Sequence, residues 1–199
     1  MGAIWIACHG YGQLAAALAR ALEPIAHGTR VLVAPEGLSR FYLDEPLKRH
    51  GADSPVGASW MTREDREHEI ADQVAYLDSL AATVRREVPS ATQLVVLGFS
   101  QGVATVCRWL AHGGTRAHWL ILWSGPLPRD LPMDRGAQLF GGARITLVAG
   151  DADRVVPPQS LERDLAALRG LGLDAELVRH AGGHTLHADT LRGLAADDQ

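Results

Sequence analysis

Short apolar runs alternate along the chain with amphipathic segments, and this alternation constrains the fold more than any other feature. Five runs are apolar, with Thr146 as the one polar residue among them: residues 4–7, 31–34, 94–97, 119–123 and 145–149. A weaker run follows at residues 175–178. Runs of this length without polar alternation are typical of parallel strands that are covered on both faces. The pattern therefore predicts about six strands in a compact, mostly parallel sheet.

The segments between these runs have helical spacing. Leu14, Leu18 and Leu22 share one helical face, and similar spacing occurs within residues 70–84 and 161–168. A strand followed by a helix and a further strand implies right-handed crossovers, which place helices on both faces of the sheet. The predicted fold class is therefore α/β.

The composition of the 199-residue chain is that of a globular protein, and we predict one domain over residues 1–199. Charged residues make up 21% and the formal net charge is -4, so no basic patch indicates nucleic-acid binding. Residues 3–8 lack a basic leader and are too short for a signal peptide or a membrane span. We expect a cytoplasmic protein without stable membrane insertion, in which Cys8 and Cys107 are buried thiols. The sequence is compatible with a homodimer.

The sequence GFSQG, residues 98–102, stands between an apolar run and a helical pattern. Glycines on both sides of a serine let a strand and a helix approach closely while the hydroxyl projects from a sharp turn. This arrangement is typical of the turn that carries a nucleophile, and we predict that role for Ser100. An ordinary strand-to-helix turn is the plainer alternative.

A serine hydroxyl is a weak nucleophile, so a base must lie within hydrogen-bond distance. The segment AGGHTL places His184 after the last apolar run and before a final helical stretch, and we predict it as the base. His180 and His187 lie nearby, which leaves a metal site of three histidines as an alternative. No carboxylate or thiolate stands at suitable spacing to complete such a site, so we expect neither a metal nor a cofactor.

An anion must hold the histidine in the correct tautomer. The segment GDADRVVPP follows the fifth apolar run and contains Asp151 and Asp153. We predict Asp153 as the acid, because Asp151 directly follows Gly150 and is better placed to hydrogen-bond the turn backbone. The order Ser100, Asp153, His184 is that of the nucleophile, acid and base in α/β-hydrolases.

Two backbone amides are needed to stabilise an oxyanion. Gln101, at the start of the helix after the serine, is predicted to supply one. Tyr11, in the HGYG segment after the first apolar run, is predicted to supply the other. Taken alone, HGYG is weak evidence, because a flexible turn would also account for it.

Two long segments, residues 36–61 and 125–142, fit neither period and contain several prolines and glycines. Long connections of this kind are typical of binding loops or lids, and we predict that a substrate lies between them. A core position is an equal alternative for the aromatic residues in the first segment. The side chains predicted to contact substrate there are Phe41, Tyr42, Leu43, Trp60 and Met61.

Taken in this order, HGYG, GFSQG, GDADRVVP and GGHTL resemble the small carboxylesterase and acyl-protein thioesterase branch of the α/β-hydrolase superfamily. The resemblance extends from Cys8 to His184, and GFSQG is particularly typical of this phospholipase/carboxylesterase branch. It implies the α/β-hydrolase fold and a cofactor-free, carboxylesterase-like serine hydrolase. Its expected partner is a small-molecule ester, with thioesters as further candidate substrates.

Two other functions are compatible with the same fold. A lactone or dienelactone hydrolase would use similar chemistry, but such enzymes usually carry a cysteine nucleophile and position 100 is serine. A non-catalytic binding module on a hydrolase scaffold belongs to a different class, because fold alone does not determine function. Its expected mark is the loss of a triad residue, and none is lost in this sequence.

Overall fold

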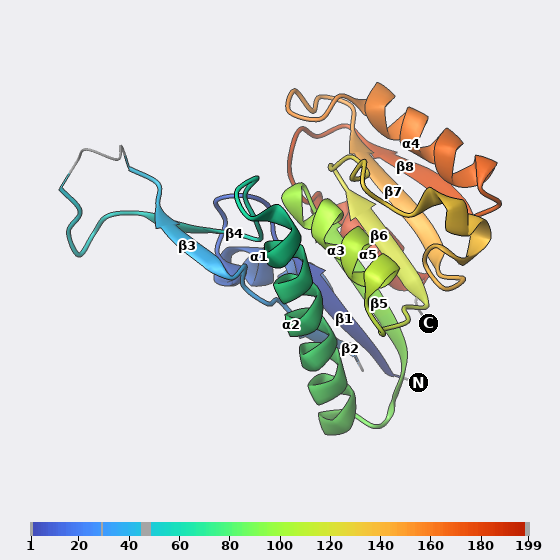
Figure 1. Ribbon diagram of the computed structural model, residues 1–199, viewed down its shortest axis with the longest axis horizontal. Helices are drawn as coiled ribbons and strands as arrows, with labels where there is room; N and C mark the ends of the chain where they lie inside the picture. Colours follow the sequence, from blue (N-terminus) through green and yellow to red (C-terminus); the bar gives the residue numbers. More distant parts are fainter. Residues whose placement is uncertain (1, 29, 45–48, 198–199) are drawn as a thin grey trace.

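The computed structural model describes residues 2–28, 30–44 and 49–197. Within this part of the chain the main sheet has six strands, all parallel, in the spatial order β2-β1-β5-β6-β7-β8. The α/β fold class predicted from the alternating runs is confirmed (Figure 1). The strands are β1 (Gly2–Cys8), β2 (Arg30–Val33), β5 (Ala91–Phe99), β6 (Trp119–Trp123), β7 (Arg144–Gly150) and β8 (Ala175–His180).

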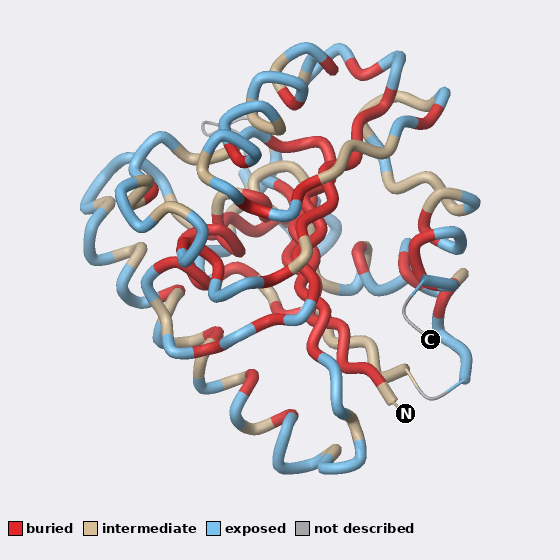
Figure 2. Tube along the Cα trace, turned by 90° about the vertical axis from the view of Figure 1, so that its right-hand side faces the viewer, coloured by how far each residue is buried: buried red, intermediate tan, exposed pale blue. Residues whose placement is uncertain are grey.

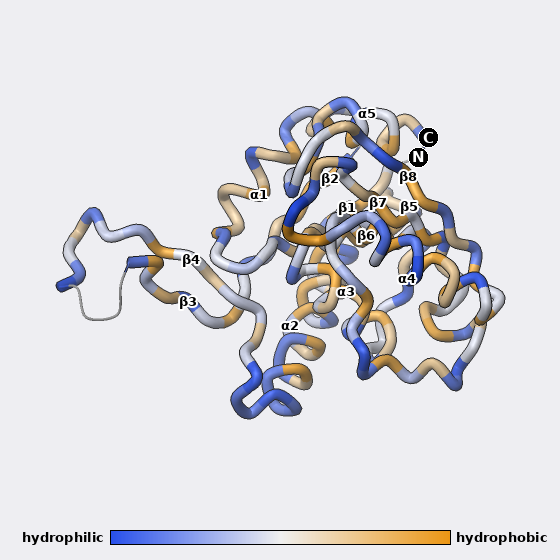
Figure 3. The backbone as a smooth tube through the Cα atoms, turned by 90° about the horizontal axis from the view of Figure 1, so that it is seen from above, coloured by the Kyte–Doolittle hydropathy of each residue, from blue (hydrophilic) through white to orange (hydrophobic). Residues whose placement is uncertain are grey.

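Burial on both faces explains why the apolar runs form strands. Every residue of β6 is buried, since the strand is paired on both edges and covered on both sides. The edge strand β2 is only half-buried throughout. Figure 2 shows buried residues running through the middle of the molecule and exposed residues on the outer turns. Figure 3 shows hydrophobic stretches among the strands of the sheet and also on turns of the helices that cover it.

Helices cover the sheet on both faces (Figure 1). On one face, Leu22 of α1 and Leu191 of α5 pack in a core with Trp5 of β1. On the other face, Trp109 of α3 and Leu161 of α4 belong to a larger core that α2 also joins. The helices are α1 (Ala15–Leu22), α2 (Arg66–Glu87), α3 (Gln101–His112), α4 (Pro158–Gly170) and α5 (Ala188–Ala196), with short 3-10 helices η1 (Glu23–Ile25) and η2 (Met133–Gln138).

An antiparallel hairpin lies within residues 36–61, where the sequence predicts a binding loop or lid. It consists of β3 (Ser39–Tyr42) and β4 (Val56–Ser59), and it projects away from the main sheet (Figure 1). The base of the hairpin is held by backbone hydrogen bonds from Gly12 to Ala58 (2.9 Å) and from Ala58 to Gln13 (3.1 Å). The hairpin is therefore joined to the loop that follows β1.

The two cysteines, Cys8 and Cys107, are buried free thiols, as the sequence predicts. Burial raises the pKa of both thiols well above the usual range, so both stay protonated at neutral pH. No helix in residues 2–28, 30–44 and 49–197 has the length and hydropathy of a membrane span.

The packing of α3 against the end of β1 yields a test. A Cβ atom at Gly102 would lie 2.1 Å from the carbonyl oxygen of Cys8, so Gly102→Ala must push the helix away from the strand. We expect this substitution to lower the free energy of unfolding by about 1–3 kcal/mol, measured by urea denaturation.

Gly193→Ala is the matched control, because Gly193 lies in helix α5 with nothing within 4 Å of its added Cβ. It should raise stability by about 0.5–1 kcal/mol. Equal effects of the two substitutions would contradict the close approach of α3 to β1.

Candidate active site

Ser100 occupies a sharp turn between β5 and α3. Its backbone has a φ of 54° and a ψ of -115°, a conformation that L residues rarely adopt and that tends to occur at functional sites. The flanking glycines are required by close contacts: a Cβ at Gly98 would lie 2.5 Å from the carbonyl oxygen of Gly102. The paired glycines thus allow strand and helix to meet with the serine at the crossing point.

The structure brings Ser100, His184 and Asp153 together in one hydrogen-bonded chain. His184 Nε2 lies 2.9 Å from Ser100 Oγ, and His184 Nδ1 lies 2.8 Å from Asp153 Oδ2. The carboxylate is almost fully buried, with 1% of its side chain exposed, whereas the imidazole is 21% exposed. A carboxylate can only accept, so Nδ1 carries the proton and Nε2 is free to accept the one from Ser100.

Asp153 and not Asp151 contacts the histidine. Asp153 Oδ1 accepts hydrogen bonds from the amides of Val155 (2.8 Å) and Val156 (2.9 Å). Burial acts to raise the pKa of Asp153, but these bonds and the one from His184 outweigh it and hold the pKa below its usual value. Asp151 was expected to bond the turn backbone; instead it is exposed and pairs with Arg179 at 2.7 Å.

The three neighbouring histidines do not converge on a common point. His184 bonds Ser100 and Asp153, while His180 Nδ1 accepts from the Gly182 amide at 3.1 Å. His187 accepts from the Thr190 amide at the start of α5. Across the described residues, no group of three or more His, Cys, Asp or Glu side chains is arranged to hold a metal ion. The geometry does not support the alternative of a three-histidine metal site.

The loop after β1 lies against the serine turn. A Cβ at Gly10 would lie only 3.1 Å from the Cβ of Ser100. The Gly10 amide bonds Gln13 Oε1 (2.9 Å) and the Gly12 amide bonds the Ala58 carbonyl. Within the part of the chain that the structure describes, the Tyr11 amide between them donates no hydrogen bond. It is available to an incoming ligand.

The hairpin residues predicted to contact substrate divide between two faces, as alternation along a strand requires. The Phe41 ring packs against Tyr11, with centroids 5.1 Å apart. A Cβ at Gly12 would lie 3.4 Å from Leu43, which puts Leu43 beside the same loop. Tyr42 instead stacks on His50 at 4.0 Å. Phe41 and Leu43 therefore border the Tyr11 loop, and Tyr42 does not.

Trp60 and Met61 also occupy different environments. Trp60 is 1% exposed, and its Nε1 donates to the His9 carbonyl oxygen at 2.9 Å. It belongs to the core, so it is removed from the predicted substrate surface. Met61 is half-buried, and its sulfur accepts a contact from Arg108 at 3.1 Å.

The side chain of Gln101 has a structural role that the sequence analysis did not predict. Its Nε2 donates to Ser59 Oγ (2.9 Å) and to the Met61 carbonyl (3.1 Å), and its Oε1 accepts from the Trp60 amide (3.2 Å). One side chain therefore fastens the end of the hairpin to the first turn of α3. A side-chain amide directly after Ser100 is visible in the sequence, but its partners lie about 40 positions away.

His9 links the Tyr11 loop to the segment that precedes the hairpin. Its Nδ1 donates to the Gly10 carbonyl (2.8 Å) and its Nε2 accepts from the Gly37 amide (2.9 Å), so the ring is neutral. Burial lowers the pKa of His9 and favours this neutral form.

The sequence analysis also did not predict two exposed apolar side chains, Leu38 beside Gly37 and Val155 in the Asp153 loop.

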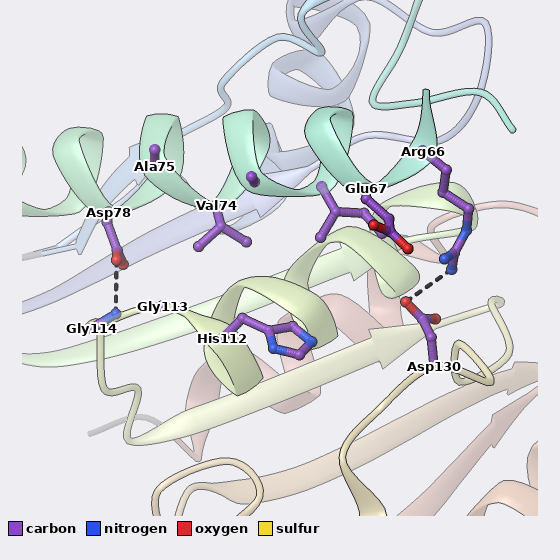
Figure 4. A pocket seen from close by; sticks show the side chains of 11 residues that line it. Arg66, Glu67, Val74, Ala75, Asp78, His112, Gly113, Gly114 and Asp130 are labelled. Atoms are coloured by element: carbon purple, nitrogen blue, oxygen red, sulfur yellow. Dashed lines mark hydrogen bonds and ion pairs between the residues drawn. The ribbon is translucent and has the colours of Figure 1, made fainter. Parts of the chain in front are cut away.

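A separate cavity of about 650 Å³ lies between α2 and α3 (Figure 4). Its lining does not include Ser100. At one end Arg66 pairs with Asp130 at 2.8 Å, and at the other Asp78 accepts from the Gly114 amide at 2.7 Å. Asp130 and Asp78 are thus already partnered, and we assign this cavity no part in the chemistry.

Residues 8–189 match the family model that is described as serine hydrolase (FSH1). The curated proteins contain no match to this chain. The matched range includes the three hydrogen-bonded residues Ser100, Asp153 and His184.

Solved structures with the same fold include esterases and a thioesterase. Esterase PE8 aligns with a TM-score of 0.70 and 23% identity over 98% of this chain and 90% of its own. Acyl-protein thioesterase 2 of Zea mays aligns with a TM-score of 0.70 and 20% identity, over 98% and 91%. A carboxylesterase of Mesorhizobium loti aligns with a TM-score of 0.73 and 21% identity, over 98% and 88%. At these identities the likeness shows the α/β-hydrolase fold.

The clamp formed by the Gln101 side chain can be tested by its removal. Gln101→Met keeps the length of the side chain but leaves the Trp60 amide without its acceptor. We expect a loss of about 1–3 kcal/mol in the free energy of unfolding, measured by urea denaturation.

Gln138→Met in the exposed part of η2 is the matched control and should change stability by less than about 0.5 kcal/mol. A Gln101→Met protein as stable as this control would show that the clamp contributes nothing.

Proposed function

Because the chain belongs to the FSH1 serine hydrolase family, we propose that it hydrolyses carboxylic esters through an acyl-enzyme formed on Ser100. Thioesters are further candidate substrates. The observation that carries the proposal is the continuous chain of hydrogen bonds from Ser100 through His184 to Asp153. The esterases and the thioesterase that share the fold support the same class of reaction.

The first step is nucleophilic attack. Ser100 Oγ forms a bond to the ester carbonyl carbon while its proton passes to His184 Nε2. The resulting imidazolium is stabilised by Asp153, which stays ionised because its hydrogen bonds hold the pKa of its carboxyl low. The 2.9 Å separation of nitrogen and oxygen is suitable for direct proton transfer.

The carbonyl oxygen becomes an oxyanion during this attack. We assign its stabilisation to the amides of Tyr11 and Gln101, the second of which lies at the N-terminus of α3. Gly10 allows the Tyr11 loop to approach the serine, since any side chain at position 10 would crowd Ser100. Two preorganised donors of this kind stabilise the transition state more than the ground state.

The tetrahedral intermediate then collapses. The bond to the alcohol or thiol breaks, and His184 returns its proton to that leaving group. In the second half of the reaction a water molecule attacks the acyl carbon while His184 accepts a proton from it. The acid is released and Ser100 regains its hydrogen, so side chains, amides and water complete every step.

The acyl group is assigned to the surface formed by Tyr11, Phe41 and Leu43. Tyr11 and Leu43 are 63% and 48% exposed, and apolar side chains left in solvent beside a reactive serine suit a hydrocarbon ligand. Two other candidates from the sequence are not assigned to this surface, because Tyr42 stacks on His50 and Met61 contacts Arg108. A lactone would need less of this surface, so a preference for short cyclic esters would favour that alternative.

Replacement of the nucleophile tests the proposal. Ser100→Ala should lower kcat for nitrophenyl esters by several orders of magnitude, with a residual rate of about 10³-fold over water from the oxyanion amides. Esters from acetate to laurate, together with acyl-thioesters, should be assayed on the same preparation.

Ser79→Ala, exposed on α2, is the control and should keep full activity. A Ser100→Ala protein with near-normal turnover would rule out the serine mechanism. A wild type inactive on every ester and thioester would favour the binding-module alternative.

The assignment of Asp153 as the orienting acid can be separated from a role for Asp151. Asp153→Asn replaces an acceptor with an amide that can hold the imidazole in the wrong tautomer, which costs about 10⁴-fold in kcat in a comparable triad. Asp151→Asn should have little effect, because its carboxylate is exposed and bonds Arg179. Kinetics and thermal midpoints of both variants make the test. Loss of turnover in a folded Asp151→Asn protein, with mild loss in Asp153→Asn, would reverse the assignment.

A further inference from the structure

We propose that His180 is a positioning residue that holds the His184 loop against the Asp153 loop, and that it does so only while its ring is neutral. The inference rests on the proposed function, because it concerns the geometry of the same hydrogen-bonded chain. His180 contacts neither Ser100 nor Asp153 through any hydrogen bond. It acts through the loops on either side of it.

His180 stands where the two loops meet. It is the last residue of β8, and β8 pairs with β7, whose end leads to Asp153. The Asp151 amide donates to the His180 carbonyl (2.8 Å), and the Ala152 amide donates to the Gly182 carbonyl (3.0 Å). The loop that carries His184 is therefore fastened to the loop that carries Asp153 at His180 and directly after it.

The His180 ring fills the space beneath this junction. Its Nδ1 accepts from the Gly182 amide at 3.1 Å, and a Cβ at Gly150 would lie 3.1 Å from its Cε1. The ring contacts Trp123, with centroids 5.7 Å apart and the planes tilted by 47°, and it stacks on His187 at 5.1 Å and 16°. With 5% of the residue exposed, every side of the ring is occupied by protein.

Trp123 connects the ring directly to the loop that carries the base. Its Nε1 donates to the carbonyl oxygen of Thr185 at 3.0 Å, and Thr185 is the residue after His184. His187, which stacks on the ring, is the N-cap of α5, where the same loop ends. The His180 ring thus contacts both residues that hold the far half of this loop.

The surroundings require a neutral ring. Because Nδ1 accepts a hydrogen bond, the proton of the neutral form is on Nε2, which is buried and has no hydrogen-bond partner among the described residues. Protonation of Nδ1 would set an N–H against the N–H of Gly182. That bond would break, and Gly182 would be pushed from its place beside the Asp153 loop.

The charges that face His180 act in both directions. Asp151 and Asp153, from the β7–α4 loop, favour a cation, but Asp151 is paired with Arg179 and Asp153 already accepts three hydrogen bonds. Burial and the neighbouring His187 disfavour the cation and lower the pKa of His180 below its ordinary value of 6.5. The neutral state therefore persists to more acidic pH than for a free histidine, and it is lost as pH falls through that lowered pKa.

The test measures log kcat/KM of the intact protein against pH, from about pH 8 to below about pH 5, as far as the far-UV circular dichroism stays constant. The part of this profile in which activity falls as the pH falls is its acid limb. Each proton that inactivates the enzyme adds a slope of about one. In the wild type two protonations inactivate the enzyme, one at the base and one at His180, so the limb steepens by about one at its acid end. His180→Asn keeps an acceptor for the Gly182 amide and cannot be protonated, so this extra step should disappear.

His112→Asn is the matched control, because His112 lies exposed at the far end of α3 from Ser100, and it should leave the profile unchanged. His9 is retained in all variants, so any step that it adds is common to their profiles. Equal steepness in the wild type and in His180→Asn would overturn the inference. If His180→Asn does not fold, His187→Asn decides the question. Asparagine retains a cap for α5, and the substitution removes the group that disfavours the His180 cation. The steep part of the acid limb must then begin at higher pH.

The two proposals fail in different ways. Turnover by Ser100→Ala would reject the serine mechanism whatever the shape of the acid limb. An inactive Ser100→Ala protein, together with profiles of equal steepness, would reject only the role of His180.

Discussion

The close approach of the first turn of α3 to the end of β1 is the contact on which the rest of the site depends. A Cβ at Gly102 would lie 2.1 Å from the Cys8 carbonyl oxygen, so the two backbones meet with no side chain between them. Ser100 is thereby held at the helix N-terminus and against Gly10, which introduces the Tyr11 amide. The proposed nucleophile and the two proposed oxyanion amides, which follow separate strands, become neighbours through one backbone crossing.

The remaining groups reach this point through loops that are fastened to one another. The Gln101 side chain and the neutral His9 ring join the hairpin to the serine turn and to the Tyr11 loop. Backbone hydrogen bonds around His180 join the Asp153 loop to the His184 loop. The candidate active site is thus supported by polar contacts within the protein at each place where a loop leaves the sheet. Such support holds reacting groups to the narrow range of geometry that catalysis requires.

The sequence predicted the sheet and the meeting of Ser100, His184 and Asp153 for the same reason. Each of these residues follows an apolar run, and the carboxyl ends of parallel strands lie at one edge of a sheet. The hairpin of β3 and β4 was not predictable, because its short strands are stabilised by pairing with each other and by contact with Gly12 rather than by an apolar pattern. The core position of Trp60 and the partners of Gln101 also depend on contacts between distant segments, which local periodicity does not record.

The central claim is that Ser100 carries the acyl group during turnover. The most direct measurement is to mix the protein with a slowly hydrolysed nitrophenyl ester, quench the mixture in acid at successive times and map the acyl group by peptide mass spectrometry. We predict an acyl mass on the peptide that contains Ser100, formed no more slowly than the first turnover and lost at the steady-state rate. An acyl group on a different residue, or steady turnover without any acylated protein, would contradict the account.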